Sequence, residues 1–176
     1  MRVLALVPDD DARDAALAGL TAYDRPRLAK LPPYTGTRVS DCGAGTLVVV
    51  PVGPGGAAAA GVAAGVAVNR AVPDLVLAVD VMPDLVPGED AVLVGEAVEL
   101  DGEAAAVDSW LADEALRRLP SAQKGQAAGP VSTGAYAAAR VHGRRFLALT
   151  VRGPDPESAR AALTELVPLL LASELR

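Results

Sequence analysis

The stretch TLVVVPVGPGGAAAAGVAAGVAVNRAVPDLVLAVDVMPD, residues 46–84, decides the fold of this chain. Thr46–Val52 is a short, β-branched apolar run, which is typical of a strand buried on both faces. The glycine-rich turn Gly53–Gly56 ends this run, and Ala57–Arg70 has the length and the alanine content of a helix. A second apolar strand, Leu75–Val81, follows. The stretch therefore predicts two parallel strands joined by a right-handed crossover helix.

The predicted crossover helix carries no charged residue before Arg70, so no side of it is suited to water. Gly61 and Gly65 lie four residues apart on one face, where they would let another backbone come close. We expect burial on two sides, by the sheet and by either a neighbouring helix or a second copy of the chain. This pattern favours a homo-oligomer formed through the helix Ala57–Ala71.

The composition of the 176-residue chain limits its class. Hydrophobic residues make up 51% and aromatic residues 3%, so Ala, Val and Leu must fill the core. The net charge of -6 argues against nucleic acid, because no basic stripe exists to neutralise phosphates. No apolar run approaches the ~20 residues that span a bilayer, and the single cysteine, Cys42, permits no internal disulfide. We expect one cytoplasmic α/β domain, residues 1–176, without nucleic-acid or membrane partners.

Strands and helices alternate along the rest of the chain. The remaining expected strands are Arg2–Val7, Thr37–Ser40 (a hairpin with Thr46–Val52), Ala91–Leu100 (one strand or a pair), Pro130–Ser132 and Arg145–Val151. Expected helices follow Asp9–Asp11, start at Asp108 or Ser109, cover Gly134–His142, and run from Asp155 to about Ser173. Ala22–Gly36 is expected to be a loop and a candidate lid. The alternation predicts a three-layer αβα sandwich with a mostly parallel or mixed central sheet.

The turn Gly53-Pro54-Gly55-Gly56-Ala57-Ala58 matches the pattern G-x-G-x-x-A of dinucleotide-binding folds. A glycine turn before a helix N-terminus suits a phosphate, but Pro54 removes one N–H donor. Because a chain this rich in Gly and Ala matches by chance, we favour a plain turn over a nicotinamide or flavin site. We also expect no cofactor and no metal, since His142 is the only histidine and no ligand pair has metal-site spacing.

Carboxylates near strand ends are the remaining candidates for chemistry, because ligands of open α/β sheets bind at the carboxyl ends of strands. Asp80 stands out, since it interrupts an apolar strand end. A buried carboxylate there needs a partner, an exposed edge or a raised pKa. Asp9–Asp11 favour a helix cap first and a pocket position second. The full set is Asp10, Asp80, Asp84, Glu89, Asp90, Glu96 and Asp155.

Five stretches carry a family resemblance: VLALVPDDDARDAALAGL, VGPGGAAAA, PDLVLAVDVMPDL, GEDAVLVGE and FLALTVRGPD. In this order they resemble the nucleoside phosphorylase and nucleosidase superfamily, and within it futalosine hydrolase. The resemblance implies a phosphorylase/hydrolase-like fold and hydrolysis of the N-glycosidic bond of a purine-type nucleoside. It implies that Asp155 protonates the departing base and that Asp10 or Asp11 orients the attacking water. It also implies substrate contacts from Gly53, Gly55, Asp80, Met82, Asp84, Ser132 and Thr133.

The chain departs from this family at two places. Asp80–Asp84 replaces the Gly-rich strand end G-x-A-G-G, where small residues let the substrate lie against the backbone. The family's Met-Glu pair, which grips the ribose hydroxyls, has no counterpart before the strand at Arg145. These departures favour an alternative function, a catalytically degenerate relative that binds a small molecule or a protein without turnover.

A second resemblance concerns pyroglutamyl peptidase, a family of the same architecture. Its cysteine stretch S-A-G-T-Y-V-C-N-H is similar to Ser132–Arg140, STGAYAAAR. The position of the nucleophile is Ala138, however, and the last strand contains no histidine. This relationship would therefore imply the fold without the cysteine peptidase chemistry.

Overall fold

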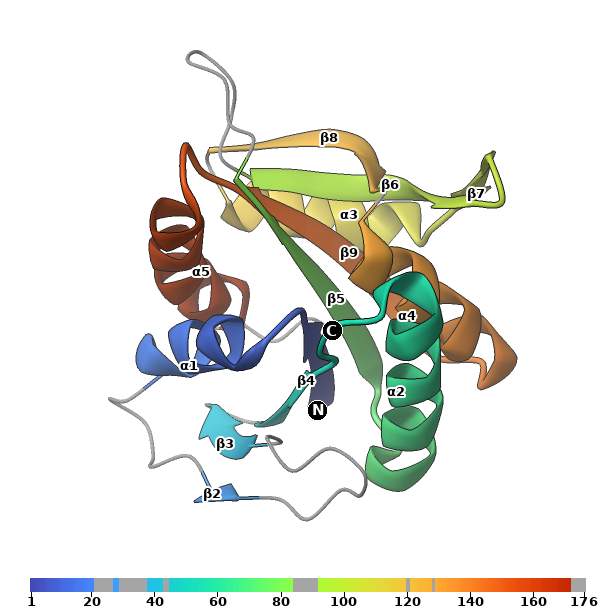
Figure 1. Cartoon of the computed structure of the whole chain (residues 1–176), viewed down its shortest axis with the longest axis horizontal. Helices are drawn as coiled ribbons and strands as arrows, with labels where there is room; N and C mark the ends of the chain where they lie inside the picture. The colour runs from blue at the N-terminus through green and yellow to red at the C-terminus, as the bar shows by residue number, and fades with distance from the viewer. Residues whose placement is uncertain are drawn as a thin grey trace.

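The computed structural model describes residues 1–20, 27–28, 38–42, 45–83, 92–119, 121–127 and 129–171. The strands are β1 (Arg2–Val7), β2 (Arg27–Leu28), β3 (Arg38–Cys42), β4 (Gly45–Pro51), β5 (Leu75–Met82), β6 (Val92–Leu100), β7 (Glu103–Ala106), β8 (Ala122–Ala127) and β9 (Arg145–Arg152). The helices are α1 (Asp10–Ala18), α2 (Gly56–Ala71), α3 (Ser109–Arg118), α4 (Pro130–Val141) and α5 (Pro156–Leu171). Strands and helices alternate as expected, with helices on both sides of the sheet (Figure 1).

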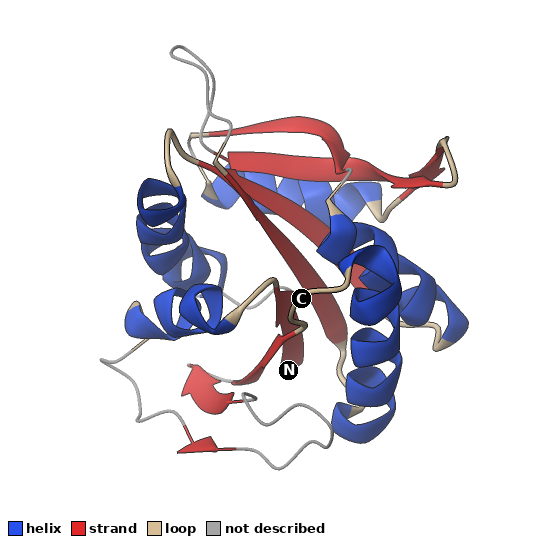
Figure 2. Ribbon diagram, viewed as in Figure 1, coloured by secondary structure: helices blue, strands red, loops and turns tan. Residues whose placement is uncertain are grey.

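The strands form one mixed sheet in the order β2-β3-β4-β1-β5-β9-β6-β7, with β8 paired to β6. The central strands β4, β1, β5 and β9 are parallel to one another. The strand β1 lies between the two strands that α2 connects. At the flanks, β3 pairs antiparallel with β4, as expected for the hairpin, and β6 pairs antiparallel with β9. The predicted three-layer α/β architecture with a mixed sheet is confirmed (Figure 2).

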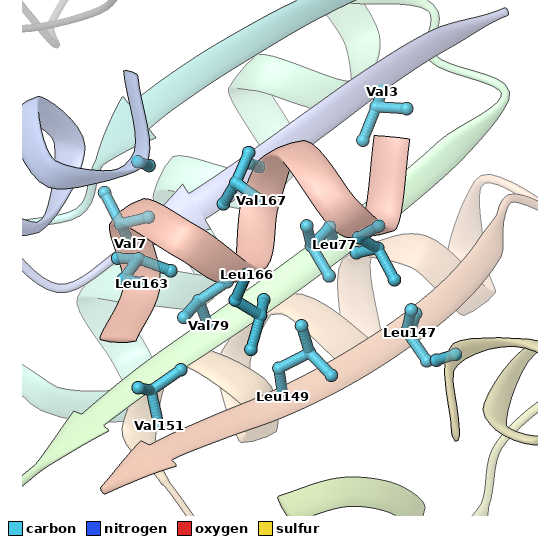
Figure 3. Close-up of a cluster of buried hydrophobic side chains, with 14 of the residues drawn as sticks. Val3, Val7, Leu77, Val79, Leu147, Leu149, Val151, Leu163, Leu166 and Val167 are labelled. Carbon is cyan, nitrogen blue, oxygen red and sulfur yellow. The ribbon is translucent and has the colours of Figure 1, made fainter. Parts of the chain in front are cut away.

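Each face of the sheet has its own apolar core, because neighbouring residues of a strand point to opposite faces. Val3, Ala5 and Val7 of β1 belong to the core beneath α1, α3 and α5. Figure 3 shows this core, in which Leu163, Leu166 and Val167 of α5 lie over side chains of β5 and β9. Leu4 and Leu6 belong to the other core, with residues of α2 and α4. Even-numbered residues of β5 face this second core, which places Asp80 on the α4 side.

The alanine-rich helix α2 is buried against the sheet and against a neighbouring helix, α4. Its buried side chains are Ala60, Ala63, Ala64, Ala67, Val68 and Ala71. A Cβ atom at Gly134 of α4 would collide with the carbonyl oxygen of Ala57 and lie 2.5 Å from the amide nitrogen of Gly61. A Cβ at Gly65 would meet only open space. The close approach of two backbones therefore occurs at Gly61, and a helix of the same chain provides the second buried side.

Two expectations about the chain after residue 122 are wrong. Pro130–Ser132 is the first turn of α4 and not a strand. Proline suits the first helical position, and the expected short helix therefore begins four residues earlier. The expected link Gln123–Ala128 is largely the strand β8, which pairs in parallel with β6. Its polar residues Gln123, Lys124 and Gln126 are exposed, so the composition of this segment did not indicate a strand.

Local signals for turns and caps are confirmed elsewhere. Asp101 and Gly102 form the turn between β6 and β7, with φ of 51° and 83°. Asp108 caps α3, since its carboxylate accepts a hydrogen bond from the Leu111 amide. Trp110 of α3 is 44% exposed, with the Arg145 guanidinium 5.1 Å from its ring centre. The candidate lid Ala22–Gly36 lies outside the described residues except for β2. Among the described helices, none is long and apolar enough to cross a membrane.

Candidate functional site

The carboxyl ends of the central strands form the edge at which four helices begin. There, Gly53 N donates a hydrogen bond to Pro8 O (3.0 Å), which joins the loops after β1 and β4. Gly153 N donates to Met82 O (3.2 Å), which joins the ends of β5 and β9. The helices α1, α2 and α5 follow β1, β4 and β9 directly, and α4 begins beside the end of β5. This edge gathers nearly all of the predicted site residues that the structure describes.

The acidic residues before α1 are paired with arginines. Asp9 caps α1 by accepting a hydrogen bond from Ala12 N (2.8 Å). Nη2 of Arg160 lies 3.4 Å from Asp9 Oδ2 and 3.3 Å from Asp11 Oδ2. Asp10 pairs with Arg13, whose side chain is buried. The carboxylates of Asp10 and Asp11 nevertheless remain largely exposed, and Arg160 ties the start of α1 to α5.

The glycine turn between β4 and α2 depends on left-handed backbone. Gly53, Gly55 and Gly56 have φ of 74°, 132° and 66°, which residues with a Cβ rarely adopt. Gly55 precedes α2, and among the described residues no side chain caps the start of this helix. No described side chain therefore competes with a ligand for its first amides, as the G-x-G-x-x-A pattern requires.

Asp80 and Ser132 are buried and bound to each other. The Asp80 carboxylate accepts hydrogen bonds from Val131 N (2.9 Å), Ser132 N (3.0 Å) and Ser132 Oγ (2.5 Å). Asp80 of β5 thus caps the start of α4, where the N-cap residue Gly129 has no side chain to do so. Burial raises the pKa of Asp80, while the hydrogen bonds from Ser132 and Val131 oppose that change. Gly129 is required beside it, because a Cβ there would collide with the carboxylate.

The other predicted residues at the end of β5 and the start of α4 have separate positions. Thr133 Oγ1 donates a hydrogen bond to Glu99 O of β6 (3.2 Å). Met82 is half-buried, and its carbonyl is engaged by Gly153. Asp84 lies outside the described residues, as do Glu89 and Asp90.

Asp155 stands exposed at the start of α5, directly after β9. Its carboxylate accepts hydrogen bonds from Ser158 N and Ser158 Oγ, both at 2.8 Å. These bonds, led by the one from the Ser158 amide, lower the pKa of Asp155 below its usual value. Asp155 is therefore a carboxylate at neutral pH and caps α5, as its sequence context predicts.

Two residues of this edge escaped the sequence analysis. Arg160 lies within α5, and only its contacts with Asp9 and Asp11 reveal that it belongs here. Gly129 is needed because of Asp80, which is 49 residues away in the chain. Among the described residues, no group of three or more His, Cys, Asp or Glu side chains could hold a metal ion.

No protein-family model and no curated protein matches this sequence. Solved structures do match over nearly the whole chain. An S-adenosylhomocysteine nucleosidase from Streptococcus pyogenes has 11% identity and a TM-score of 0.74, with 100% of this chain and 98% of that chain covered. This chain therefore has the fold of that nucleosidase.

Two further solved structures match this chain over a similar extent. Futalosine hydrolase of Helicobacter pylori, solved as a mutant, has 11% identity, a TM-score of 0.77 and coverage of 98% of this chain and 99% of that chain. The 5'-methylthioadenosine/S-adenosylhomocysteine nucleosidase of Neisseria meningitidis, in complex with methylthio-immucillin-A, has 11% identity and a TM-score of 0.75, with 97% and 98% covered. At such low identity the likeness establishes the fold, and the predicted resemblance is confirmed at that level.

Proposed function

We propose that this chain is a nucleosidase-like hydrolase that cleaves the N-glycosidic bond of a purine-type nucleoside. One observation carries the proposal: the two acidic groups that the reaction needs begin the neighbouring helices α5 and α1. Asp155 caps α5, Asp9–Asp11 begin α1, and Arg160 of α5 contacts Asp9 and Asp11. The solved structures that share this fold and are named as nucleosidases support the same reaction class.

Hydrolysis of an N-glycosidic bond develops positive charge on the sugar and negative charge on the departing base. In the proposed mechanism, the minority of Asp155 that is protonated supplies a proton to the base as the bond to the sugar breaks. Asp10 or Asp11 accepts a hydrogen bond from a water molecule and directs its oxygen at the sugar carbon. Arg160 holds Asp11 in place, because its guanidinium lies 3.3 Å from the Asp11 carboxylate. The uncapped amides at the start of α2, after Gly53 and Gly55, offer donors for the substrate's hydroxyl groups.

A second candidate function is a degenerate relative that binds a ligand without turnover. The observation that favours it is the Asp80–Ser132 contact, since Asp80 occupies the amides of α4 that an open strand end would leave to a substrate.

We also propose that the chain is a single cytoplasmic domain and that it self-associates through α2. Val62 of α2 is 63% exposed, which leaves an apolar residue on its outer side.

Base release from a panel of nucleosides separates the two functions. We expect the wild-type protein to release a purine-type base from methylthioadenosine, S-adenosylhomocysteine or futalosine, as measured by chromatography of the products. The double variant Asp10→Asn/Asp11→Asn tests the proposed catalytic carboxylates. Asp113→Asn makes the same replacement at a surface carboxylate and is the control. Binding of these nucleosides with no base release would replace the hydrolase by the binding module. Absence of both binding and release would contradict both candidates.

A further inference from the structure

A cavity of about 430 Å³ lies at the edge of the sheet opposite to the candidate active site. Arg145 in its wall pairs with Leu75 at the start of β5, whereas Arg152 pairs with Met82 at the other end. Seven residue steps of about 3.3 Å separate these ends of β9, a distance of roughly 23 Å. The cavity is therefore a separate place on the molecule. Its lining includes Asp108, Tyr136, Arg140, Arg144, Arg145 and Phe146.

Three guanidinium groups and one carboxylate give this cavity a positive wall in a chain of net charge -6. Within the part of the chain that the structure describes, neither Arg140 nor Arg144 makes an ion pair. Nε of Arg144 is buried and has no hydrogen-bond partner. A buried donor without a partner is costly, so a ligand with acceptor oxygens would remove that cost. The Asp108 carboxylate is engaged with the Leu111 amide at 3.4 Å.

The arginines stand on backbone that is held in one conformation. After α4, Gly143 N donates to Arg140 O (3.1 Å) and Arg144 N donates to Ala139 O (2.9 Å). With φ of 60° at Gly143, these two bonds form a Schellman motif. Arg145 begins β9, and its guanidinium lies over the ring of Trp110. The backbone that carries the arginines is therefore ordered before any ligand arrives, which reduces the entropy that binding would cost.

Two aromatic residues also line the cavity. The rings of Tyr136 and Phe146 meet edge to face, with centres 5.4 Å apart and planes at 79°. The Tyr136 hydroxyl donates a hydrogen bond to Ala106 O (3.0 Å), which fixes the orientation of its ring. The cavity thus offers both cationic and aromatic groups to one small molecule, and its volume is in the range of ligand sites.

We propose that this arginine cavity binds a small organic phosphate, with the phosphate oxygens between Arg140 and Arg144 and the apolar part against Tyr136 and Phe146. A guanidinium group matches the geometry of phosphate and binds it through paired hydrogen bonds. Arginines near a helix C-terminus are also favoured by the helix dipole alone. That explanation accounts for the position of Arg140, but not for the buried, unpartnered Nε of Arg144 or for Arg145 on a strand.

Calorimetric titration with phenyl phosphate at low salt tests the proposal. We expect the wild-type protein to bind phenyl phosphate more tightly than inorganic phosphate, and Arg140→Gln/Arg144→Gln to weaken the affinity at least about tenfold. Arg70→Gln/Arg117→Gln removes the same charge from exposed helix positions and should change the affinity less than about twofold. Circular dichroism verifies that both variants are folded. No binding to wild type at millimolar concentration, or equal weakening in the two double variants, would overturn the proposal. The readout does not depend on nucleoside hydrolysis.

Discussion

Replacing Asp155 by asparagine should lower the kcat of base release by about 10²–10⁴-fold, the usual contribution of general acid–base catalysis. Asparagine keeps the size of the side chain and can still accept a hydrogen bond from Ser158 N at the start of α5. It carries no acidic proton, so the base would depart as an anion. Because the fold does not depend on this proton, we expect KM to change far less than kcat.

The pH dependence gives an independent view of Asp155. Its pKa lies below the usual value, so the protonated form is a minority at neutral pH. Activity should therefore fall as pH rises above that pKa, and Asp155→Asn should lack this fall. In Asp155→Ser, the serine hydroxyl can still cap α5 but the carboxylic acid is lost. Asp108→Ser is the matched control, because it makes the same replacement at the start of α3. Equal activity of Asp155→Ser and Asp108→Ser would show that Asp155 is only a helix cap.

Replacing Asp80 by alanine should lower the free energy of unfolding by about 3 kcal/mol, as measured by urea denaturation. The carboxylate is 2% exposed and satisfies three donors of α4: two backbone amides and the Ser132 hydroxyl. Alanine leaves these donors buried and unpaired at the start of a helix that packs on both β5 and α2. Ser132→Ala removes the hydroxyl donor itself and leaves no hydroxyl unpaired, so it should lower the free energy of unfolding by only about 1 kcal/mol.

Two comparisons isolate the role of Asp80. Asp113→Ala removes an exposed carboxylate with one surface ion pair, and should change stability by less than about 1 kcal/mol. Burial raises the pKa of Asp80 in the folded protein above 3.8, its value in the unfolded chain. At a pH between the unfolded-state and the folded-state pKa, the folded protein keeps a proton that the unfolded chain has released. In this pH range the contribution of Asp80 to stability falls as pH rises, and Asp80→Asn should remove that pH dependence. An Asp80→Ala protein as stable as Asp113→Ala would contradict the capping role.

The parts of the fold that the sequence predicts well are those with local causes. The run Thr46–Val52 is apolar on both faces because β4 is covered by helices on both sides, and the glycine turn follows it in the chain. Asp9, Asp108 and Asp155 act as caps within three residues of the amides they bind, so a short window reveals them. Asp80 was identified as a carboxylate that needs a partner, which it has in α4.

The parts that the sequence does not predict depend on residues far apart in the chain. The partners of Asp80 are 51 and 52 positions away, at Val131 and Ser132. They lie in the segment Pro130–Ser132, which was expected to be a strand and is the start of α4. The strand β8 was missed because its pairing with β6, rather than an apolar pattern, defines it. The arginine cavity likewise joins the end of α4 to residues near β7, and VHGRR alone indicates only a solvated surface.

Hydrogen–deuterium exchange with methylthio-immucillin-A tests the proposed nucleoside site, because it locates a nucleoside analogue on the fold. We expect slower exchange in residues 80–82, 129–133 and 153–158, at the carboxyl ends of the strands, and no change at residues 140–145. Protection confined to residues 140–145, or unchanged exchange with a saturating analogue, would contradict a nucleoside site at this edge.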